Sequence, residues 1–232
     1  MNRRKILVCS AIAAIAGLGL TPAPRAAPAG AKPVDPAAIS YFGIQAQGVP
    51  ACASCHGLQG QGERVQNGPR LAALNEDYLD AQLEAFAAGQ RRSSVMEPIA
   101  RRLTSDQRSA LSAYFALLPP AREPGSVDSA RIPRGADLAL IGDWSRQVPP
   151  CASCHGPHGA GVGSLTPPLV GQSPDYLLRQ LTAFREGDRQ GPLGLMSGIA
   201  KRLSKDDLQA AAAYYAGLPL SQASPARPKA KP

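Results

Sequence analysis

Aromatic residues are scarce in this sequence. Phenylalanine, tryptophan and tyrosine make up 5% of its 232 residues, which is few for the interiors of two protein domains. We therefore expect something other than side chains to fill part of the interior. No segment shows sustained alternation of apolar and polar residues, whereas apolar residues recur at helical spacing. The sequence therefore predicts an all-α fold.

Cysteine and histidine are also few, with five and three residues. Four of the cysteines lie in two C-x-x-C-H pentapeptides, at 52–56 and 151–155, and Cys9 lies in an N-terminal apolar run. The pentapeptide is typical of haem c attachment, in which two thiols add to the haem vinyl groups and the histidine binds the iron. Three other interpretations of the motif are weaker. A thioredoxin-like dithiol would need a βαβ unit, and a zinc site would have to join cysteine pairs 99 residues apart. Disulfides would not explain the histidine that follows each pair.

The formal charge of +8 would ordinarily suggest a nucleic acid or an anionic membrane as partner. Residues 30–121 carry eight basic and eight acidic side chains, and residues 135–220 carry seven of each. The excess lies in the N-terminal segment, in the segment between the halves and in the tail. The distribution therefore excludes nucleic acid, because a nucleic-acid binder concentrates positive charge on a folded face. A loose association with a membrane surface stays open.

The first 29 residues have the layout of a secretory signal peptide. Arg3, Arg4 and Lys5 precede an apolar run at 6–20, and an Ala-Pro-Ala sequence at 27–29 offers a cleavage site. The run is shorter than the ~20 residues that a spanning helix needs. We predict export to the periplasm and cleavage of residues 1–29.

The remaining chain is an internal repeat. Beyond the pentapeptides, Y-L-x-x-Q-L-x-x-F occurs at 78–86 and 176–184, and M-x-x-I-A-x-R-L occurs at 96–103 and 196–203. The repeat predicts one domain at 30–121 and a second at 135–220. Residues 122–134 are proline-rich and predict a linker, and residues 221–232 predict a disordered basic tail.

Within each half, capping residues predict where the longer helices begin and end. Asn75 and Ser173 are candidate N-caps, and Gly89 and Gly187 stand where C′ glycines end helices. A last helix should begin near residue 104 or 204, where Thr104 opens a capping-box pattern, and should end before the proline at 119 or 219.

Methionine supplies the candidate sixth ligand of each iron. Without the leader only Met96 and Met196 remain, 40 residues after His56 and 41 after His155. A lone methionine is usually core filler, but here the methionines match the haems in number and repeat in position. We therefore predict axial ligation by methionine; a lysine ligand stays open, and His158 is too close to His155 to reach the opposite haem face. The predicted site residues are the thioether cysteines Cys52, Cys55, Cys151 and Cys154 and the axial ligands His56, Met96, His155 and Met196.

These motifs carry a family resemblance over roughly residues 36–219. Each half resembles a class I cytochrome c domain, and the pair resembles the dihaem cytochrome c4 family. The resemblance implies a tandem of two small helical domains, each wrapped around a covalently bound haem. It also implies that the carbonyls of Pro69 and Pro168 orient the two histidines, and that Gly43 and Gly142 pack against the last helices.

Six-coordinate haems leave no open position for a substrate, so we expect an electron carrier and no enzyme. The first hypothesis is a periplasmic one-electron carrier with two haem c groups that donates to a terminal oxidase. The alternative is the haem subunit of a periplasmic dehydrogenase complex, and a dihaem peroxidase is the third reading. The expected partners are redox proteins (a membrane oxidase, a quinol–cytochrome c reductase or a dehydrogenase), with no small-molecule substrate. We expect the basic pairs at 91–92, 101–102 and 201–202 to lie on a solvated face, with docking or haem-propionate binding as alternatives.

Overall fold

The computed structural model describes residues 34–63, 67–121 and 126–222, so the predicted leader and most of the tail lie outside the described residues. In these ranges the chain is helical, and extended segments pair only as isolated bridges. This confirms the all-α prediction.

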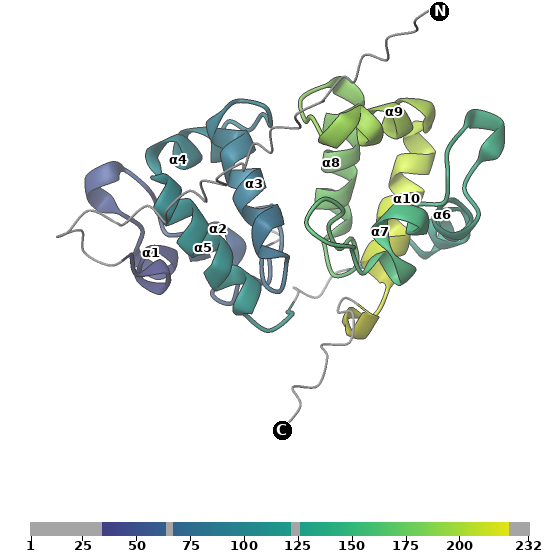
Figure 1. Cartoon of the computed structure of the whole chain (residues 1–232). Helices are drawn as coiled ribbons and strands as arrows, with labels where there is room; N and C mark the ends of the chain where they lie inside the picture. The colour runs from purple at the N-terminus through teal and green to yellow at the C-terminus, as the bar shows by residue number, and fades with distance from the viewer. Residues whose placement is uncertain (1–33, 64–66, 122–125, 223–232) are drawn as a thin grey trace, which may run out of the picture. The chain divides into compact units, whose positions relative to one another are not determined.

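The first half contains α1 (Pro36–Phe42), α2 (Ala53–His56), α3 (Glu76–Ala87), α4 (Met96–Arg102) and α5 (Ser105–Leu117) (Figure 1). The second contains α6 (Ile132–Leu140), α7 (Ala152–His155), α8 (Pro174–Glu186), α9 (Leu195–Arg202) and α10 (Lys205–Gly217). Short 3₁₀ turns lie at Gln45–Gln47, Ser129–Arg131, Trp144–Arg146, Pro157–Gly159, Pro192–Gly194 and Leu220–Gln222.

The predicted caps set the ends of α3 and α8. The side chain of Asn75 accepts a hydrogen bond from a first-turn amide of α3 at 3.0 Å, and Ser173 does the same for α8 at 3.2 Å. Gly89 (φ 73°) and Gly187 (φ 89°) stand in the left-handed region just past each helix. Since glycine has no Cβ, it adopts that conformation with little strain.

The last helices begin with capping boxes in both halves. Thr104 and Gln107 cap α5 reciprocally, and Ser204 and Asp207 do the same for α10. Both helices end two residues before a proline, as predicted. The third residue of the helix is therefore the neutral Gln107 in α5 and the charged Asp207 in α10.

The hydrophobic cores of the two halves differ in composition. In the first half, α1, α3 and α5 surround Tyr78, Phe115 and several aliphatic side chains. In the second half, α6 and α10 pack closely, and a run of alanines at 210–213 is buried. The crossing depends on Gly135 of α6, because a β-carbon there would collide with the carbonyl oxygen of Ala210.

The implied role of Gly43 and Gly142 is wrong. Both follow the first helix of their half with a positive φ, and a β-carbon at either would meet the backbone of the loop that follows, at Val49 or Val148. They are turn residues because the chain reverses there, and the close helix crossing of the second half falls on Gly135.

The predicted linker at 122–134 is too long. Asp128 caps a 3₁₀ turn, and α6 begins at Ile132. Pro133 misled the prediction: in the first turn of a helix its missing N–H costs nothing, because that N–H has no intrahelical partner.

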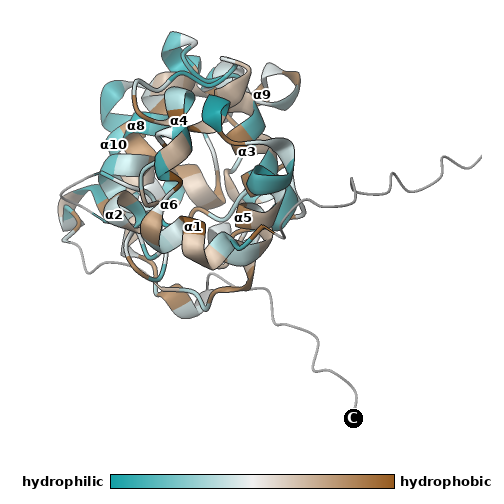
Figure 2. Ribbon diagram, turned by 90° about the vertical axis from the view of Figure 1, so that its left-hand side faces the viewer, coloured by the Kyte–Doolittle hydropathy of each residue, from teal (hydrophilic) through white to brown (hydrophobic). Residues whose placement is uncertain are grey.

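The short helices each carry polar and apolar residues. Figure 2 shows hydrophilic and hydrophobic stretches within the same helices, as expected where one face lies on a core. In the part of the chain that the structure describes, no helix is both long and apolar enough to cross a membrane.

Candidate haem sites

The C-x-x-C-H pentapeptides form single helical turns, α2 and α7. In each turn the histidine amide donates to the carbonyl of the first cysteine, His56 to Cys52 at 2.9 Å and His155 to Cys151 at 3.0 Å. Residues three apart lie on one face of such a turn, so the two thiols of each pair are presented together. Cys52, Cys55, Cys151 and Cys154 are all free thiols.

Both histidines are buried and held by a loop carbonyl. Nδ1 of His56 lies 2.9 Å from the carbonyl oxygen of Pro69, and Nδ1 of His155 lies 2.9 Å from that of Pro167. A carbonyl can only accept, so each Nδ1 carries the hydrogen. The lone pair of each Nε2 is therefore free to bind a metal.

The implied partner of His155, Pro168, is one residue off. The two histidines are 99 positions apart, whereas the next helices, which begin after Asn75 and Ser173, are 98 apart. The second half therefore has one residue fewer in this loop, and Pro167 occupies the place of Pro69.

Burial keeps both imidazoles neutral. It lowers the pKa of His56 and of His155, the hydrogen bond to the proline carbonyl opposes this, and the positive charge of Arg91 or Arg189 lowers each pKa further. Neutral imidazole is the form that binds iron. Burial also raises the pKa of the Cys52 thiol to about 11.

In the second half, the predicted residues converge on one cavity. Cys151, Cys154, His155 and Met196 all line a cavity of about 330 Å³, together with many apolar side chains. In the first half, Met96 is the first residue of α4 and is half-buried, as Cys52 and Cys55 are.

These residues fit haem c. The described residues contain no cluster of three or more histidine, cysteine or acidic side chains that could hold a bare metal ion. A porphyrin supplies four nitrogens itself, so its iron needs only two protein ligands. An apolar cavity with two free thiols, a neutral imidazole and a thioether matches that requirement.

The sequence prediction missed a buried polar cluster shared by the two halves. Arg91 and Arg189 are each 7% exposed, so the expectation of a solvated face is wrong for Arg91. It holds for Arg92 and for the basic pairs at 101–102 and 201–202, which are exposed. Arg91 donates to Tyr176 (2.9 Å) and Gln180 (2.7 Å) of the other half. The spacing of 98 residues, which relates Arg91 to Arg189, was the signal available in the sequence.

A second contact between the halves centres on Arg70, directly after the proline that binds His56. Its side chain is 2% exposed and donates to the carbonyls of Ala72 and of Val170. Its backbone exchanges two hydrogen bonds with the side chain of Gln172, at 3.0 and 2.8 Å. Gln172 also lines the cavity of the second half. Arg70 therefore joins the two histidine-binding loops.

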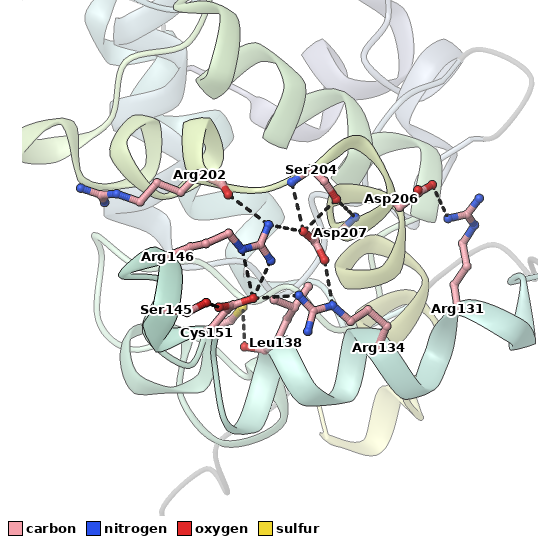
Figure 3. Close-up of polar contacts among 11 residues, drawn as sticks. Arg131, Arg134, Leu138, Ser145, Arg146, Cys151, Arg202, Ser204, Asp206 and Asp207 are labelled. Carbon is pink, nitrogen blue, oxygen red and sulfur yellow. Dashed lines mark hydrogen bonds and ion pairs between the residues drawn. The ribbon is translucent and has the colours of Figure 1, made fainter.

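Among the described residues, a network of two arginines and two aspartates occurs in the second half and has no counterpart in the first. Arg134 of α6 and Arg146 of the following loop both donate to Asp207 of α10, at 2.8 and 2.7 Å, and both also donate to Asp143 (Figure 3). Asp207 accepts further bonds from Ser204. In the first half, the residues that correspond to Asp207 and Arg146 are Gln107 and Gln47.

Comparison with known proteins agrees with this geometry. The family model described as cytochrome c matches residues 47–118, and that described as cytochrome c oxidase, cbb3-type, subunit III matches residues 147–214. A thiosulfate dehydrogenase electron acceptor of Thiomonas intermedia is 42% identical over 77% of this chain and 83% of its own. Cytochrome c4 of Thiocapsa roseopersicina is 37% identical over 72% of this chain and 86% of its own. The structure of thiosulfate dehydrogenase (TsdBA) from Marichromatium purpuratum is 44% identical with a TM-score of 0.75; the match covers 80% of this chain and 40% of that longer one.

Two helical halves, each with a C-x-x-C-H turn and a buried histidine, define a c-type cytochrome with two haem domains. The chain belongs to the dihaem cytochrome c4 family. It binds two haem c groups covalently, and it is an electron-transfer protein rather than an enzyme.

Proposed function

We propose that Cys52, Cys55, Cys151 and Cys154 form the thioether bonds, and that His56 with Met96 and His155 with Met196 are the axial ligands. The observation that carries this assignment is the shared cavity of the second half, which Cys151, Cys154, His155 and Met196 all line. The internal repeat extends it to the first half. A haem held by these residues would supply one-electron exchange at its iron.

The protein residues prepare each site for that exchange. The hydrogen bonds from His56 to Pro69 and from His155 to Pro167 fix the orientation of the imidazoles before and after electron transfer. The apolar walls exclude water, which limits the solvent rearrangement that a change of charge would cause. Methionine as sixth ligand favours the reduced state and closes the coordination shell.

Separate substitution of the two methionines tests the ligands. Met96→Ala and Met196→Ala should each remove half of the near-infrared charge-transfer band that reports a ferric iron–methionine bond, and each should lower one of the two midpoint potentials. The matched control is Ile99→Ala or Ile199→Ala, one turn further along the same helices, which should keep the whole band. If both methionine variants keep the full band, the assignment is wrong.

We propose that the electron donor is a thiosulfate dehydrogenase. Two relatives that are 42% identical bear the name thiosulfate dehydrogenase electron acceptor. The longer TsdBA chain of Marichromatium purpuratum matches this chain over 40% of its length. These names favour the alternative, a dehydrogenase-linked haem protein. The second candidate function is a carrier that donates its electrons to a terminal oxidase. It is kept because cytochromes c4 are 34–37% identical to this chain.

Reconstitution tests the donor. The oxidised holoprotein is mixed with a thiosulfate dehydrogenase catalytic subunit and thiosulfate, and haem reduction is followed by stopped-flow absorbance. Both haems should become reduced only when all three components are present. Ascorbate provides the control for full reduction. If ascorbate reduces the haems and the complete mixture does not, the proposed donor is wrong.

The proposed location is the periplasm, after removal of a signal peptide at residues 1–29. The support comes from sequence: a basic start, an apolar run and a small-residue cleavage site. Covalent haem attachment also suits an exported chain. N-terminal sequencing of the mature holoprotein from a periplasmic extract tests both the location and the cleavage site.

A further inference from the structure

The cavity of the second half has a buried hydroxyl group in its wall. Tyr215 of α10 lines this cavity together with Cys151 and His155. The residue is 2% exposed, and within the described part of the chain its hydroxyl oxygen makes no hydrogen bond of regular geometry. A buried polar group without a partner is destabilising, because burial removes the hydrogen bonds that water would supply. The hydroxyl therefore indicates a partner that completes its bonding in the holoprotein.

The polar atom beside this hydroxyl is the sulfur of Cys151. Cys151 packs against the apolar cluster that contains Tyr215. Burial raises the pKa of both groups, and the contact between the two side chains lowers the pKa of Cys151 and raises that of Tyr215. The thiol donates its own hydrogen to the carbonyl of Leu138, at 3.3 Å (Figure 3). The tyrosine keeps its hydrogen at neutral pH, so Tyr215 is the donor of the pair and the sulfur is the acceptor.

Haem attachment changes this sulfur. When the thiol adds to a haem vinyl group, the S–C bond forms and the thiol hydrogen moves to the other vinyl carbon. The sulfur then has lone pairs but no hydrogen, so it can only accept. The carbonyl of Leu138 keeps the amide of Cys151 as a donor, at 3.2 Å. Attachment therefore leaves that carbonyl bonded and leaves the sulfur free to accept from Tyr215.

The first half has no hydroxyl at this position. Phe115 takes the place of Tyr215: each ring lies against the glycine four residues after the histidine of its half. Each ring also meets the preceding tyrosine edge-on, at 5.2 Å between centroids in the first half and 5.1 Å in the second. The neighbouring hydroxyl of Tyr114 is bonded to that of Tyr41. The two halves therefore differ by one buried donor at the cavity wall.

We infer that the hydroxyl of Tyr215 donates a hydrogen bond to the thioether sulfur of Cys151 and thereby raises the reduction potential of the second haem. The inference rests on the proposed thioether at Cys151. The positive end of the O–H dipole points at a sulfur bonded to the porphyrin, so it stabilises the extra electron of the reduced state. Hydrogen bonds to groups bonded to a redox centre are one of the means by which a protein sets its potential.

The test uses the holoprotein of Tyr215→Phe, which should fold because the first half holds phenylalanine at the same position. In a spectroelectrochemical titration, the ratio of reduced to oxidised haem at fixed potential should fall roughly threefold for one haem, which corresponds to about 28 mV for one electron. The responding haem should be the one that also responds to Met196→Ala. The other haem should keep its potential.

Resonance Raman spectroscopy tests the hydrogen bond itself. The hydroxyl hydrogen exchanges with solvent, so one thioether C–S stretching band of the wild type should shift between protein equilibrated in H2O and in D2O. In Tyr215→Phe that shift should be absent. A tyrosine that only fills space would not make the band depend on the solvent isotope.

The matched control is Tyr214→Phe. This variant removes a hydroxyl one residue away on the same helix, from a half-buried side chain that does not line the cavity. It should leave both potentials and the isotope shift unchanged. The reciprocal variant, Phe115→Tyr, places a hydroxyl at the equivalent position of the first half. It should raise the potential of the first haem and make a second C–S band sensitive to D2O.

Three results would overturn the inference. The first is that wild-type C–S bands are the same in H2O and D2O. The second is that Tyr215→Phe leaves both potentials unchanged, and the third is that Tyr214→Phe has the same effects as Tyr215→Phe. The pyridine haemochrome spectrum tests the thioethers separately, because an unattached vinyl group changes its absorption maximum. A spectrum of fully attached haem with C–S bands insensitive to D2O would contradict this inference and leave the proposed function intact.

Discussion

Replacing Asp207 by asparagine should destabilise the second domain by about 2 kcal/mol at pH 7. Asp207 is buried and accepts hydrogen bonds from two arginines and from Ser204. Asparagine preserves the shape and the cap but removes the charge. A hydrogen bond to a charged group contributes about 1.5–3 kcal/mol, against about 0.5–1.5 kcal/mol for a neutral one. Arg134 and Arg146 are 42% and 33% exposed, so the difference over two bonds is reduced by solvent screening to about 2 kcal/mol.

The loss should depend on pH in a defined direction. Burial alone would raise the pKa of Asp207, but hydrogen bonds from Arg146, Ser204 and Arg134 outweigh it and hold that pKa well below its usual range. A carboxylate whose pKa is depressed on folding stabilises the protein fully above its unfolded pKa of about 3.9. The stabilisation is lost as pH falls through the folded pKa. The difference between wild type and Asp207→Asn should therefore shrink below about pH 4.

Trp144 provides the assay, because it is the single tryptophan of the sequence and lies in the loop held by this network. Haem quenches its fluorescence in the folded domain, so urea unfolding is followed as a rise in emission at several pH values. Asp206→Asn is the matched control: that carboxylate is 87% exposed, 3.3 Å from Arg131, and should cost under about 1 kcal/mol. If the two variants are equally stable at pH 7, or if the penalty at position 207 persists unchanged at pH 3, the reasoning is refuted.

Three further substitutions test the packing, each by urea unfolding of the holoprotein. Gly159→Ala should destabilise by about 2 kcal/mol or more, because φ is +71° and a β-carbon would lie 2.5 Å from the Tyr215 ring. The control Gly163→Ala, at φ +60° with no neighbour within 4 Å, should destabilise by only about 1 kcal/mol. Equal losses of stability would contradict the steric argument. Gly135→Ala should destabilise by more than about 2 kcal/mol, because α6 would have to move away from the Ala210 carbonyl, and a wild-type midpoint would show that the helices do not cross there. Ser173→Ala should cost about 1 kcal/mol by loss of the α8 cap, and an unchanged midpoint would mean that water replaces the cap.

The local features of the fold could be predicted from the sequence because their causes are local. A capping side chain bonds to an amide two or three residues away, so Asn75, Thr104, Ser173 and Ser204 indicate their helices without knowledge of the rest of the chain. The linker was predicted too long because the effect of a proline depends on its position within a helix. Pro133 breaks a helix interior but is accepted in a first turn, and only the structure shows which turn it occupies.

The residues of each predicted C-x-x-C-H site are adjacent in the sequence, whereas the carbonyl that holds the histidine depends on the register of a loop. C-x-x-C-H places thiols and imidazole on one turn wherever it occurs, and the structure brings Met196 to the same cavity. Pro168 was assigned in place of Pro167 because one residue is missing from the second loop, and side-by-side motifs do not reveal where a deletion falls.

By itself the sequence determined that this chain is a tandem of two helical haem domains, because the repeat, the pentapeptides and the caps act over a few residues. Tertiary structure alone decided that Arg91 is buried against the opposite domain, that Arg70 joins the two histidine-binding loops, and that only the second domain has a network around Asp207. Burial and ion pairing depend on groups 61 to 111 residues apart along the chain. Such groups meet only when segments distant in the sequence have packed together, so no local pattern can encode their partners.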